Sequence, residues 1–248
     1  MKQILITGAS TGIGAATAKE LAEGNTVYIH YNHSEEKARQ VAEEVRRHDG
    51  TPELLKADLS TDDGCIELAR QVKEHTDSLD LLINNAGGLL SRHSIEETSW
   101  ELAQATFELN VFSAMRLTAL LTPLIRKGQE PLIIYITSVA ARTGSPSATT
   151  YAASKGALDT YTRGVARALA PDVRVNAIAP GIIFTPFHEK STSEEQMQKF
   201  LNAIPLERGG EPREIARVVP LSWENTETWL GSDGSTGSVA LAQDFFIG

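Results

Sequence analysis

A glycine-rich turn near the N-terminus constrains the fold of this chain more than any other feature. Lys2–Thr7 (KQILIT) is an apolar run typical of a buried strand, and Ile13–Glu23 (IGAATAKELAE) has helical periodicity. Gly8, Gly12 and Gly14 lie around the junction between them. Glycines at such a junction let the backbone bend tightly and approach a pyrophosphate, which the free N–H groups of the helix N-terminus can bind. The spacing is Gly-x-x-x-Gly-x-Gly rather than Gly-x-Gly-x-x-Gly, and the context predicts a dinucleotide-binding turn.

The rest of the chain repeats this alternation of strands and helices. Further strands are expected at 26–31, 53–57, 79–84, 132–137 and 173–179, and further helices at 34–47 (with Ser34 as N-cap), 61–76, 99–126 and 150–169. The strands are almost continuously apolar, as in a parallel sheet that is buried on both faces. We therefore predict an α/β protein with one domain over residues 1–248. Its expected architecture is a Rossmann fold, a doubly wound parallel sheet of about seven strands with helices on both faces.

Composition and charge exclude several classes of function. The formal net charge of −9 argues against binding to nucleic acid or to an anionic membrane. The single cysteine, Cys65, excludes an intrachain disulfide and a cysteine-rich metal site, and it fits a reducing compartment. No apolar run reaches the length of a membrane span, and the first residues lead directly into a strand without a signal peptide. We expect a cytoplasmic protein without a bound metal.

Several further motifs follow the glycine turn in a fixed order. They are Asn84–Gly87 (NNAG), Asn110, Ser138, Tyr151-x-x-x-Lys155 and Pro180-Gly181. Together with Thr7-Gly8-x-x-x-Gly12-Ile13-Gly14, they resemble the classical short-chain dehydrogenase/reductase (SDR) family over residues 1 to about 217. Within that family the chain is most similar to 3-oxoacyl-[acyl-carrier-protein]-reductase-like members. The resemblance implies an NAD(P)(H)-dependent oxidoreductase that transfers hydride between the nicotinamide and a carbonyl or secondary alcohol.

The residue types at four of these positions suit that chemistry. Tyr151 and Lys155 are four residues apart in a predicted helix and so share one face. A free phenol has a pKa of about 10, and a cation one turn away stabilises its ionised form. Ser138 follows a strand, where its hydroxyl can hold the substrate oxygen near Tyr151. Asn110 is an unusual residue for a helix interior; by resemblance it kinks the helix and holds a water that links Lys155 to solvent.

Alone, a Tyr and a Lys with this spacing are more often a coincidence on a surface helix. The joint occurrence with the glycine turn favours a catalytic group. Asp58 closes the third expected strand, where its carboxylate can accept a hydrogen bond from an adenine amino group. By resemblance, the residues after the sixth strand contact the nicotinamide. The complete predicted cofactor site is Gly8, Ser10, Thr11, Gly12, Ile13, Gly14, Asn32, His33, Ser34, Asp58, Leu59, Asn85, Ala86, Gly87, Tyr151, Lys155, Pro180, Gly181, Ile183 and Thr185.

The end of the second strand bears on the choice of nicotinamide. An acidic residue there would bond the adenosine ribose and repel a 2′-phosphate. The chain instead has Asn32, His33 and Ser34, which can donate to a phosphate, and the first acid is Glu35. Thr11 stands where many NADP-preferring relatives carry a cation, so no strong phosphate clamp is visible. The sequence favours NADP(H) over NAD(H).

Two segments near the C-terminus are less regular. The family's mobile substrate lid would span residues of about 187–210. After Glu214, Pro220 falls where a helix should continue, at a cost of about 3 kcal/mol in a helix interior. The expected last strand and its Asp-Gly-Gly are not recognisable, so residues 218–248 depart from the family pattern, which includes a homotetramer interface built from this region.

The substrate stays open at this level. A 3-oxoacyl thioester is one candidate, although the overall acidity does not suit an acidic carrier protein. A sugar, a polyol or another small hydroxy compound is the alternative. A non-catalytic dinucleotide-binding redox sensor is the alternative from another class, but such proteins usually lose the Tyr or the Lys.

Overall fold

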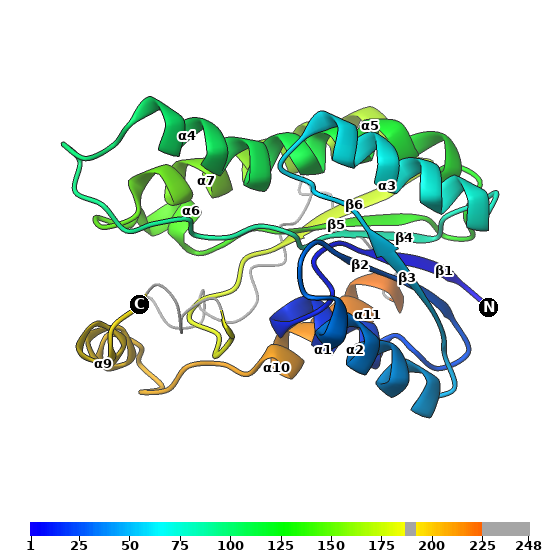
Figure 1. The fold of residues 1–248 in the computed structure, drawn as a ribbon, viewed down its shortest axis with the longest axis horizontal. Coiled ribbons are helices and arrows are strands. Elements are labelled where there is room, and N and C mark those ends of the chain that lie inside the picture. The colour runs from blue at the N-terminus through cyan, green and yellow to red at the C-terminus, as the bar shows by residue number, and fades with distance from the viewer. Residues whose placement is uncertain (187–191, 225–248) are drawn as a thin grey trace.

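The core of the protein is a six-stranded parallel sheet with the order β3-β2-β1-β4-β5-β6 (Figure 1). The computed structural model describes residues 1–186 and 192–224. The strands are β1 (Gln3–Ile6), β2 (Thr26–Tyr31), β3 (Thr51–Lys56), β4 (Leu81–Asn84), β5 (Leu132–Ile136) and β6 (Arg174–Ile178). The strands β2 and β3 lie on one side of β1, and β4, β5 and β6 lie on the other, so the strand order changes direction between β1 and β4. This is the arrangement of a Rossmann fold, and the predicted fold is confirmed. The seventh strand expected from the sequence would fall in residues 225–248, outside the described part of the chain.

Helices cover both faces of the sheet. They are α1 (Gly12–Glu20), α2 (Glu35–Arg47), α3 (Asp62–His75), α4 (Trp100–Phe107), the π-helix η1 (Glu108–Phe112), α5 (Ser113–Ile125), α6 (Ala140–Thr143), α7 (Thr149–Leu169), α9 (Glu194–Asn202), α10 (Pro212–Ala216) and α11 (Val218–Glu224). Figure 1 shows α3, α4, α5 and α7 on one side of the sheet, and α1, α2, α10 and α11 on the other.

The two faces of the sheet form two separate apolar cores. Leu82 and Tyr135 belong to the core under α3, α5 and α7, whereas Ile83 and Ile134 belong to the core under α1 and α2. Successive residues of a strand point to opposite faces. Because both faces are covered, neighbouring residues are all apolar, which explains the uninterrupted runs in the sequence.

The long helix expected at 99–126 changes its winding in the middle. The α4 helix ends at Phe107, η1 follows for five residues, and α5 begins at Ser113. The expected kink at Asn110 thus takes the form of a π-turn, a feature that is frequent at functional sites. It places the Asn110 side chain inside the protein, where the residue is 1% exposed.

The helix interruption near the C-terminus differs from the sequence prediction. Pro220 was expected to break a helix interior, but the break comes earlier, at Arg217, between α10 and α11. Pro220 is therefore the third residue of α11, in the first turn, where its missing N–H would have no helical partner in any case. Arg174 fixes the new helix by donating from Nη1 to the carbonyl oxygen of Ser222 at 2.9 Å.

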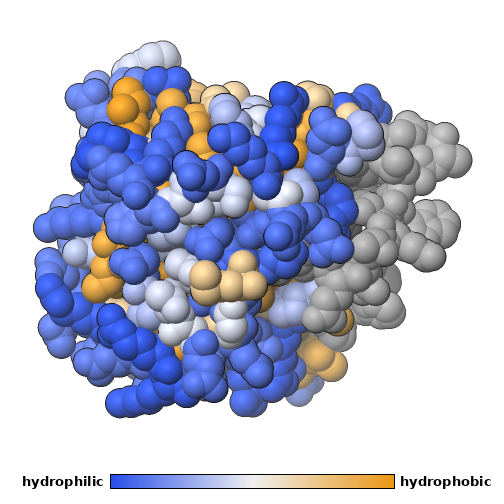
Figure 2. Space-filling model, turned by 90° about the vertical axis from the view of Figure 1, so that its right-hand side faces the viewer, coloured by the Kyte–Doolittle hydropathy of each residue, from blue (hydrophilic) through white to orange (hydrophobic). Residues whose placement is uncertain are grey.

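The surface is mainly hydrophilic. On the face of the molecule at the right of Figure 1, hydrophobic residues occur in small separated groups among polar ones (Figure 2). This pattern agrees with a net charge of −9. Within the described residues, no helix combines the length and the apolar character that crossing a membrane requires.

Candidate active site

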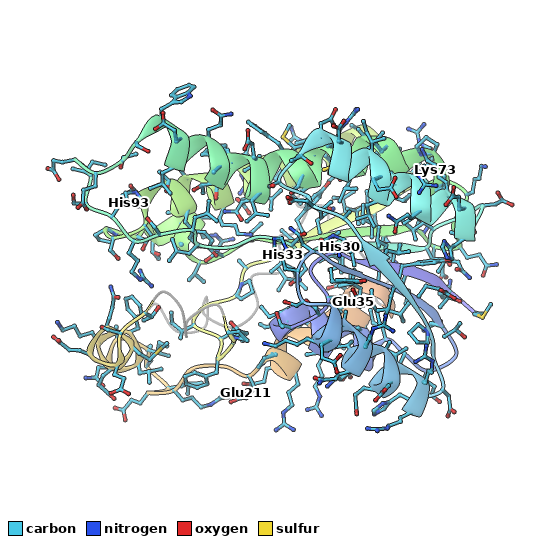
Figure 3. All side chains as sticks on the ribbon, viewed as in Figure 1. His30, His33, Glu35, Lys73, His93 and Glu211 are labelled. Carbon is cyan, nitrogen blue, oxygen red and sulfur yellow. The ribbon has the colours of Figure 1, made fainter. Side chains whose placement is uncertain are left out.

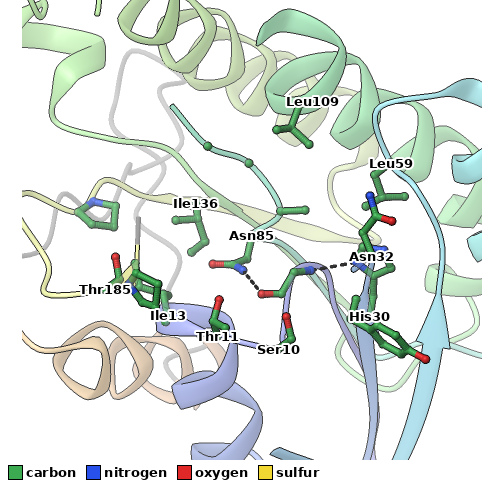
Figure 4. A pocket seen from close by; sticks show the side chains of 18 of the residues that line it. Ser10, Thr11, Ile13, His30, Asn32, Leu59, Asn85, Leu109, Ile136 and Thr185 are labelled. Atoms are coloured by element: carbon green, nitrogen blue, oxygen red, sulfur yellow. Dashed lines mark hydrogen bonds between the residues drawn. The ribbon is translucent and has the colours of Figure 1, made fainter. Parts of the chain in front are cut away.

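A cleft of about 440 Å³ opens at the carboxyl ends of the strands, where the sheet order reverses. In doubly wound folds, ligands bind at this position. The described residues that line the cleft include every predicted site residue except Gly14 and Asn110. It runs from Asn32, His33, Ser34 and Asp58 at one end, past the glycine turn, to Ser138, Tyr151 and Lys155 at the other. Figure 4 shows part of this lining.

The glycine turn is fixed by the end of β4. The Nδ2 atom of Asn85 donates to the carbonyl oxygen of Thr7 at 2.8 Å. It also donates to the carbonyl oxygen of Gly8 at 3.1 Å, a bond drawn in Figure 4. The hydroxyl oxygen of Thr7 in turn accepts from the backbone N–H groups of Asn85 and Ala86, both at 2.9 Å. The NNAG segment and the turn therefore form one hydrogen-bonded unit between β1 and β4.

Gly14 lies behind this unit rather than at the cleft surface. A Cβ atom at Gly14 would stand 2.5 Å from the carbonyl oxygen of Gly8 and 2.6 Å from Nδ2 of Asn85. Only glycine allows α1 to approach the turn so closely. The structure thus shows a packing role for Gly14, and its predicted contact with the cofactor stays a prediction.

Two helix N-termini at the cleft keep their backbone donors uncapped. Thr11 and Ser34 occupy the N-cap positions of α1 and α2, but within the described part of the chain neither side chain makes a capping bond. Thr61, Ser99 and Ser193 do cap the helices α3, α4 and α9. Ser34 thus occupies the predicted N-cap position, but its side chain makes no capping bond. Uncapped N–H groups and the positive end of the helix dipole suit an anion, so the donors at this cleft fit a dinucleotide with its phosphates.

The predicted catalytic residues lie at the opposite end of the cleft. The α7 helix carries Tyr151 and Lys155 one turn apart, and the ammonium nitrogen is 5.9 Å from the centre of the phenol ring. Nζ of Lys155 donates to the carbonyl oxygen of Ile136, at the end of β5, at 2.8 Å. Ser138 follows β5 by two residues, and its side chain hydrogen-bonds with Tyr151. The structure therefore brings together the three predicted residues.

Burial determines the charge state of this pair. Desolvation raises the pKa of Tyr151 above its ordinary value, and the hydrogen bond with Ser138 partly opposes this. Desolvation also lowers the pKa of Lys155 to about 8. At neutral pH Tyr151 is thus a phenol with a proton to give, and Lys155 is an ammonium ion.

Asn110 lies behind the cleft and connects its walls. Its Oδ1 atom accepts from the N–H of Gly88 at 2.7 Å, and Nδ2 donates to the carbonyl oxygen of Gly88 at 3.0 Å and to Oγ of Ser154 at 3.1 Å. A Cβ atom at Gly87 would stand 2.7 Å from Oδ1 of Asn110 and 3.3 Å from Nζ of Lys155. Asn110 therefore holds the NNAG loop against α7 close to Lys155, and its role in a water link stays a prediction.

At the other end, Asp58 is held in its ionised form. Its Oδ1 atom accepts from the backbone N–H of Ser60 at 3.0 Å and from the Ser60 hydroxyl at 2.8 Å. These bonds hold the pKa of the carboxyl below its usual range. The side chain at the third strand end is thus a fixed acceptor, as the predicted contact with an adenine amino group requires.

The cleft also contains residues that the sequence analysis missed. They are His30, Tyr31, Gly88, Leu109, Ile136, Thr137 and Pro186. Most of them are direct neighbours of predicted residues. His30 differs, because it stands inside the apolar run of β2 and is only 3% exposed. Its position two residues before Asn32, and so on a strand that ends at the cleft, was the available signal.

Comparisons with known proteins agree with this arrangement. The model of the family described as short chain dehydrogenase matches residues 2–196. The uncharacterized oxidoreductase YgfF of Escherichia coli (strain K12) is 34% identical over 235 residues, which cover 92% of this chain and 92% of that protein.

Two solved structures show the same fold. The angucycline C-6 ketoreductase LanV with bound NADP superposes with a TM-score of 0.83 at 29% identity, over 90% of this chain and 88% of that one. The NADH-dependent reductase A1-R′, responsible for alginate metabolism, superposes with a TM-score of 0.80 at 30% identity, over 88% of this chain and 87% of that one.

Proposed function

The chain belongs to the short-chain dehydrogenase family and is an NAD(P)-dependent oxidoreductase acting on CH–OH or carbonyl groups, and on this premise we propose that Tyr151 is its acid/base. Ser138 holds the substrate oxygen, and Lys155 stabilises the phenolate that forms when the proton leaves. The observation that carries this proposal is the contact of Ser138 with Tyr151 beside Lys155, in the cleft that also contains the glycine turn.

Tyr151, Lys155 and Ser138 each have a separate role in the proposed reaction. When bound, the nicotinamide supplies or accepts the hydride. In the direction of reduction, Tyr151 donates its proton to the carbonyl oxygen while the carbon gains the hydride, so the products are an alcohol and a tyrosinate. The ammonium of Lys155 favours this tyrosinate electrostatically. The Ser138 hydroxyl, already bonded to Tyr151, keeps the oxygen at the proton donor.

The cofactor would lie along the whole cleft. Its pyrophosphate would meet the uncapped N-terminus of α1 at Thr11–Ile13, and its adenine would meet Asp58 and Leu59. The nicotinamide end would lie near Pro180 and Tyr151, with Gly181, Ile183 and Thr185 beside it. These assignments are supported by the shared cleft.

We further propose that NADP(H) is preferred over NAD(H). The support is the uncapped N-terminus of α2 beside Asn32, His33 and Ser34, where a 2′-phosphate would find donors and no acid before Glu35. The similar solved structures include one with NADP and one NADH-dependent enzyme, so this preference concerns the present chain. A higher kcat/KM with NADPH than with NADH is the expected result, and the reverse order would overturn it.

The substrate is proposed to be a small ketone or aldehyde. A 3-oxoacyl thioester and a sugar or polyol carbonyl are the two classes to compare. The test is oxidation of NADPH and NADH in the presence of a panel that contains a 3-oxoacyl thioester, a keto sugar, a cyclic ketone and an aldehyde. Turnover of one class supports the proposal. Tight cofactor binding without turnover of any carbonyl would point instead to a redox sensor.

We also propose a cytoplasmic homotetramer and a substrate lid at residues of about 187–210. Self-association is supported by two exposed apolar side chains. Phe112, just before α5, is 52% exposed, and Met115, in α5, is 37% exposed. Light scattering coupled to size-exclusion chromatography measures the oligomer directly, and a monomer would contradict the proposal.

A further inference from the structure

His30, which lines the cleft, makes two hydrogen bonds across the sheet. Its ring nitrogen Nδ1 accepts from the backbone N–H of Gly8 at 3.0 Å, and Nε2 lies 3.2 Å from the carbonyl oxygen of Ala57. The side chain comes from β2, Gly8 follows β1, and Ala57 follows β3. One imidazole therefore connects the ends of three neighbouring strands, and Figures 3 and 4 show it among them.

The two partners determine the tautomer of this imidazole. A backbone N–H can only donate, so Nδ1 must carry a lone pair; a carbonyl oxygen can only accept, so Nε2 must carry the proton. The tautomer protonated at Nδ1 and the imidazolium ion would each direct an N–H at the N–H of Gly8. Burial lowers the pKa of His30 to about 4, against the opposing effects of the bond to Ala57 and the nearby carboxylate of Asp58. The ring is thus neutral at pH 7.

These bonds fix Gly8 from two sides. His30 holds its N–H, and the Asn85 amide holds its carbonyl oxygen at 3.1 Å. The next amide, that of Ala9, donates to the backbone oxygen of His30 at 2.8 Å. Gly8 itself has φ +63°, a backbone conformation that costs most other residues strain. The direction of the chain into the α1 N-terminus is therefore set here.

We propose that His30 is a positioning residue for the cofactor: as the neutral Nε2–H tautomer it fixes the Gly8 amide and thereby the path of the glycine turn that receives the pyrophosphate. The proposal rests on the cofactor site proposed above. It concerns cofactor affinity and not the chemical step, since the described hydrogen bonds of the His30 side chain go to Gly8 and Ala57.

The tautomer is tested on the cofactor-free protein. Long-range ¹H–¹⁵N NMR of the ¹⁵N-histidine-labelled protein at pH 7, with the His30 signals assigned by their loss in His30→Asn, distinguishes the three forms. The expected result is an unprotonated Nδ1 and a protonated Nε2. A protonated Nδ1 would overturn the proposal, whichever nicotinamide the protein uses.

The effect on the cofactor is tested with two substitutions and one control. His30→Leu removes both bonds and is expected to raise the Kd of NADPH, measured by calorimetry, about tenfold, with kcat at saturating NADPH within about twofold of the native value. His30→Asn places an amide oxygen near the Nδ1 position, so it is expected to keep the Kd within about threefold. Tyr28→Phe, on the same strand as His30, removes the bond from the Tyr28 hydroxyl to Gln3 of β1; it serves as the control and is expected to leave the Kd unchanged.

The outcomes separate the inference from the proposed function. An unchanged Kd in His30→Leu, or equal losses of affinity in His30→Leu and Tyr28→Phe, would overturn the positioning role. If His30→Leu does not fold, the NMR result and the Kd of His30→Asn decide. Failure of the native protein to bind either NADPH or NADH would refute the proposed function, while the tautomer would still test the bond to Gly8.

Discussion

The cofactor half of the cleft is held by hydrogen bonds between neighbouring strand ends, whereas α9, in the segment proposed above as the substrate lid, is attached to the rest of the protein through a few side chains. In the cofactor half, Thr7, Asn85 and His30 link the ends of β1, β2, β3 and β4 through backbone groups. In α9, none of the nine residues, all of which are described, is buried. Figure 3 shows His30 and His33 in the cofactor half.

Arg92 contacts α9 and the segment just before it. Its guanidinium lies 5.4 Å from the centre of the Phe200 ring and donates to Oγ of Ser147 and Oγ1 of Thr192, both at 3.0 Å. Gln196 adds a longer contact to Ser147 at 3.5 Å. Such partly exposed contacts open at a lower free energy than a buried, hydrogen-bonded unit. The cofactor half is thus preformed, whereas the contacts of α9 open more easily.

The largest effect is expected at the catalytic end of the cleft, at Lys155. Lys155→Met removes the cation that stabilises the phenolate and is expected to lower kcat for carbonyl reduction by about 10³-fold. Lys155→Arg keeps a charge but changes its geometry, so it should retain part of the activity. Steady-state kinetics at saturating cofactor measure both. Native kcat in Lys155→Met would contradict the assigned role.

A change inside the cofactor half is expected to cost stability. Gly14→Ala would place a methyl group 2.5 Å from the carbonyl oxygen of Gly8, so we expect a loss of about 2 kcal/mol in the free energy of unfolding. Gly164→Ala is the matched control, because no described atom would lie within 4 Å of its Cβ on α7. That control should gain about 0.5–1 kcal/mol. Urea denaturation compares the two, and equal stabilities would refute the close packing of α1.

The rate of carbonyl reduction should begin to fall at a lower alkaline pH than an ordinary lysine would give. Lys155 must be protonated to stabilise the phenolate, and its pKa is lowered to about 8 instead of raised. Activity is therefore lost as the pH rises through 8, with kcat/KM falling about tenfold per pH unit above it. This fall of kcat/KM above pH 8 should be absent in Lys155→Arg, whose guanidinium stays charged. A native profile that stays flat up to pH 10 would be the contrary result.

The smallest effect is expected at the contacts of α9. Arg92→Lys loses the stacking over Phe200 and one of the two hydroxyl contacts, so the KM of the carbonyl substrate should rise about threefold. The Kd of NADPH should not change, and Arg46→Lys on the exposed surface of α2 is the control. A rise in the Kd of NADPH equal to that in KM would show that the cofactor half and α9 are not independent.

The fold and most of the cleft could be predicted because the signals are local in the sequence. A glycine turn between a strand and a helix, strand ends with polar residues, and Tyr151 and Lys155 on one helix face all carry their meaning within a few residues. Parallel strands then bring their carboxyl ends together, which is a property of the fold and not of the particular residues.

The remainder depends on contacts between distant segments. His30 looks like a core residue of β2 until the Gly8 amide is placed 3.0 Å from its ring. The packing role of Gly14 becomes visible only when α1 is placed against the turn. The early break at Arg217 and the uncapped Ser34 follow from tertiary packing that no pattern along the chain expresses.

The central claim is that the Tyr151 hydroxyl supplies the proton, and Tyr151→Phe tests it most directly. The measurement is kcat for reduction of the best carbonyl substrate at saturating NADPH, with the Kd of NADPH determined in parallel and Tyr161→Phe on the same helix as control. We predict that kcat falls by about 10³-fold in Tyr151→Phe while the Kd changes less than about threefold, and that Tyr161→Phe keeps native kcat. A Tyr151→Phe protein with most of its activity would contradict the account.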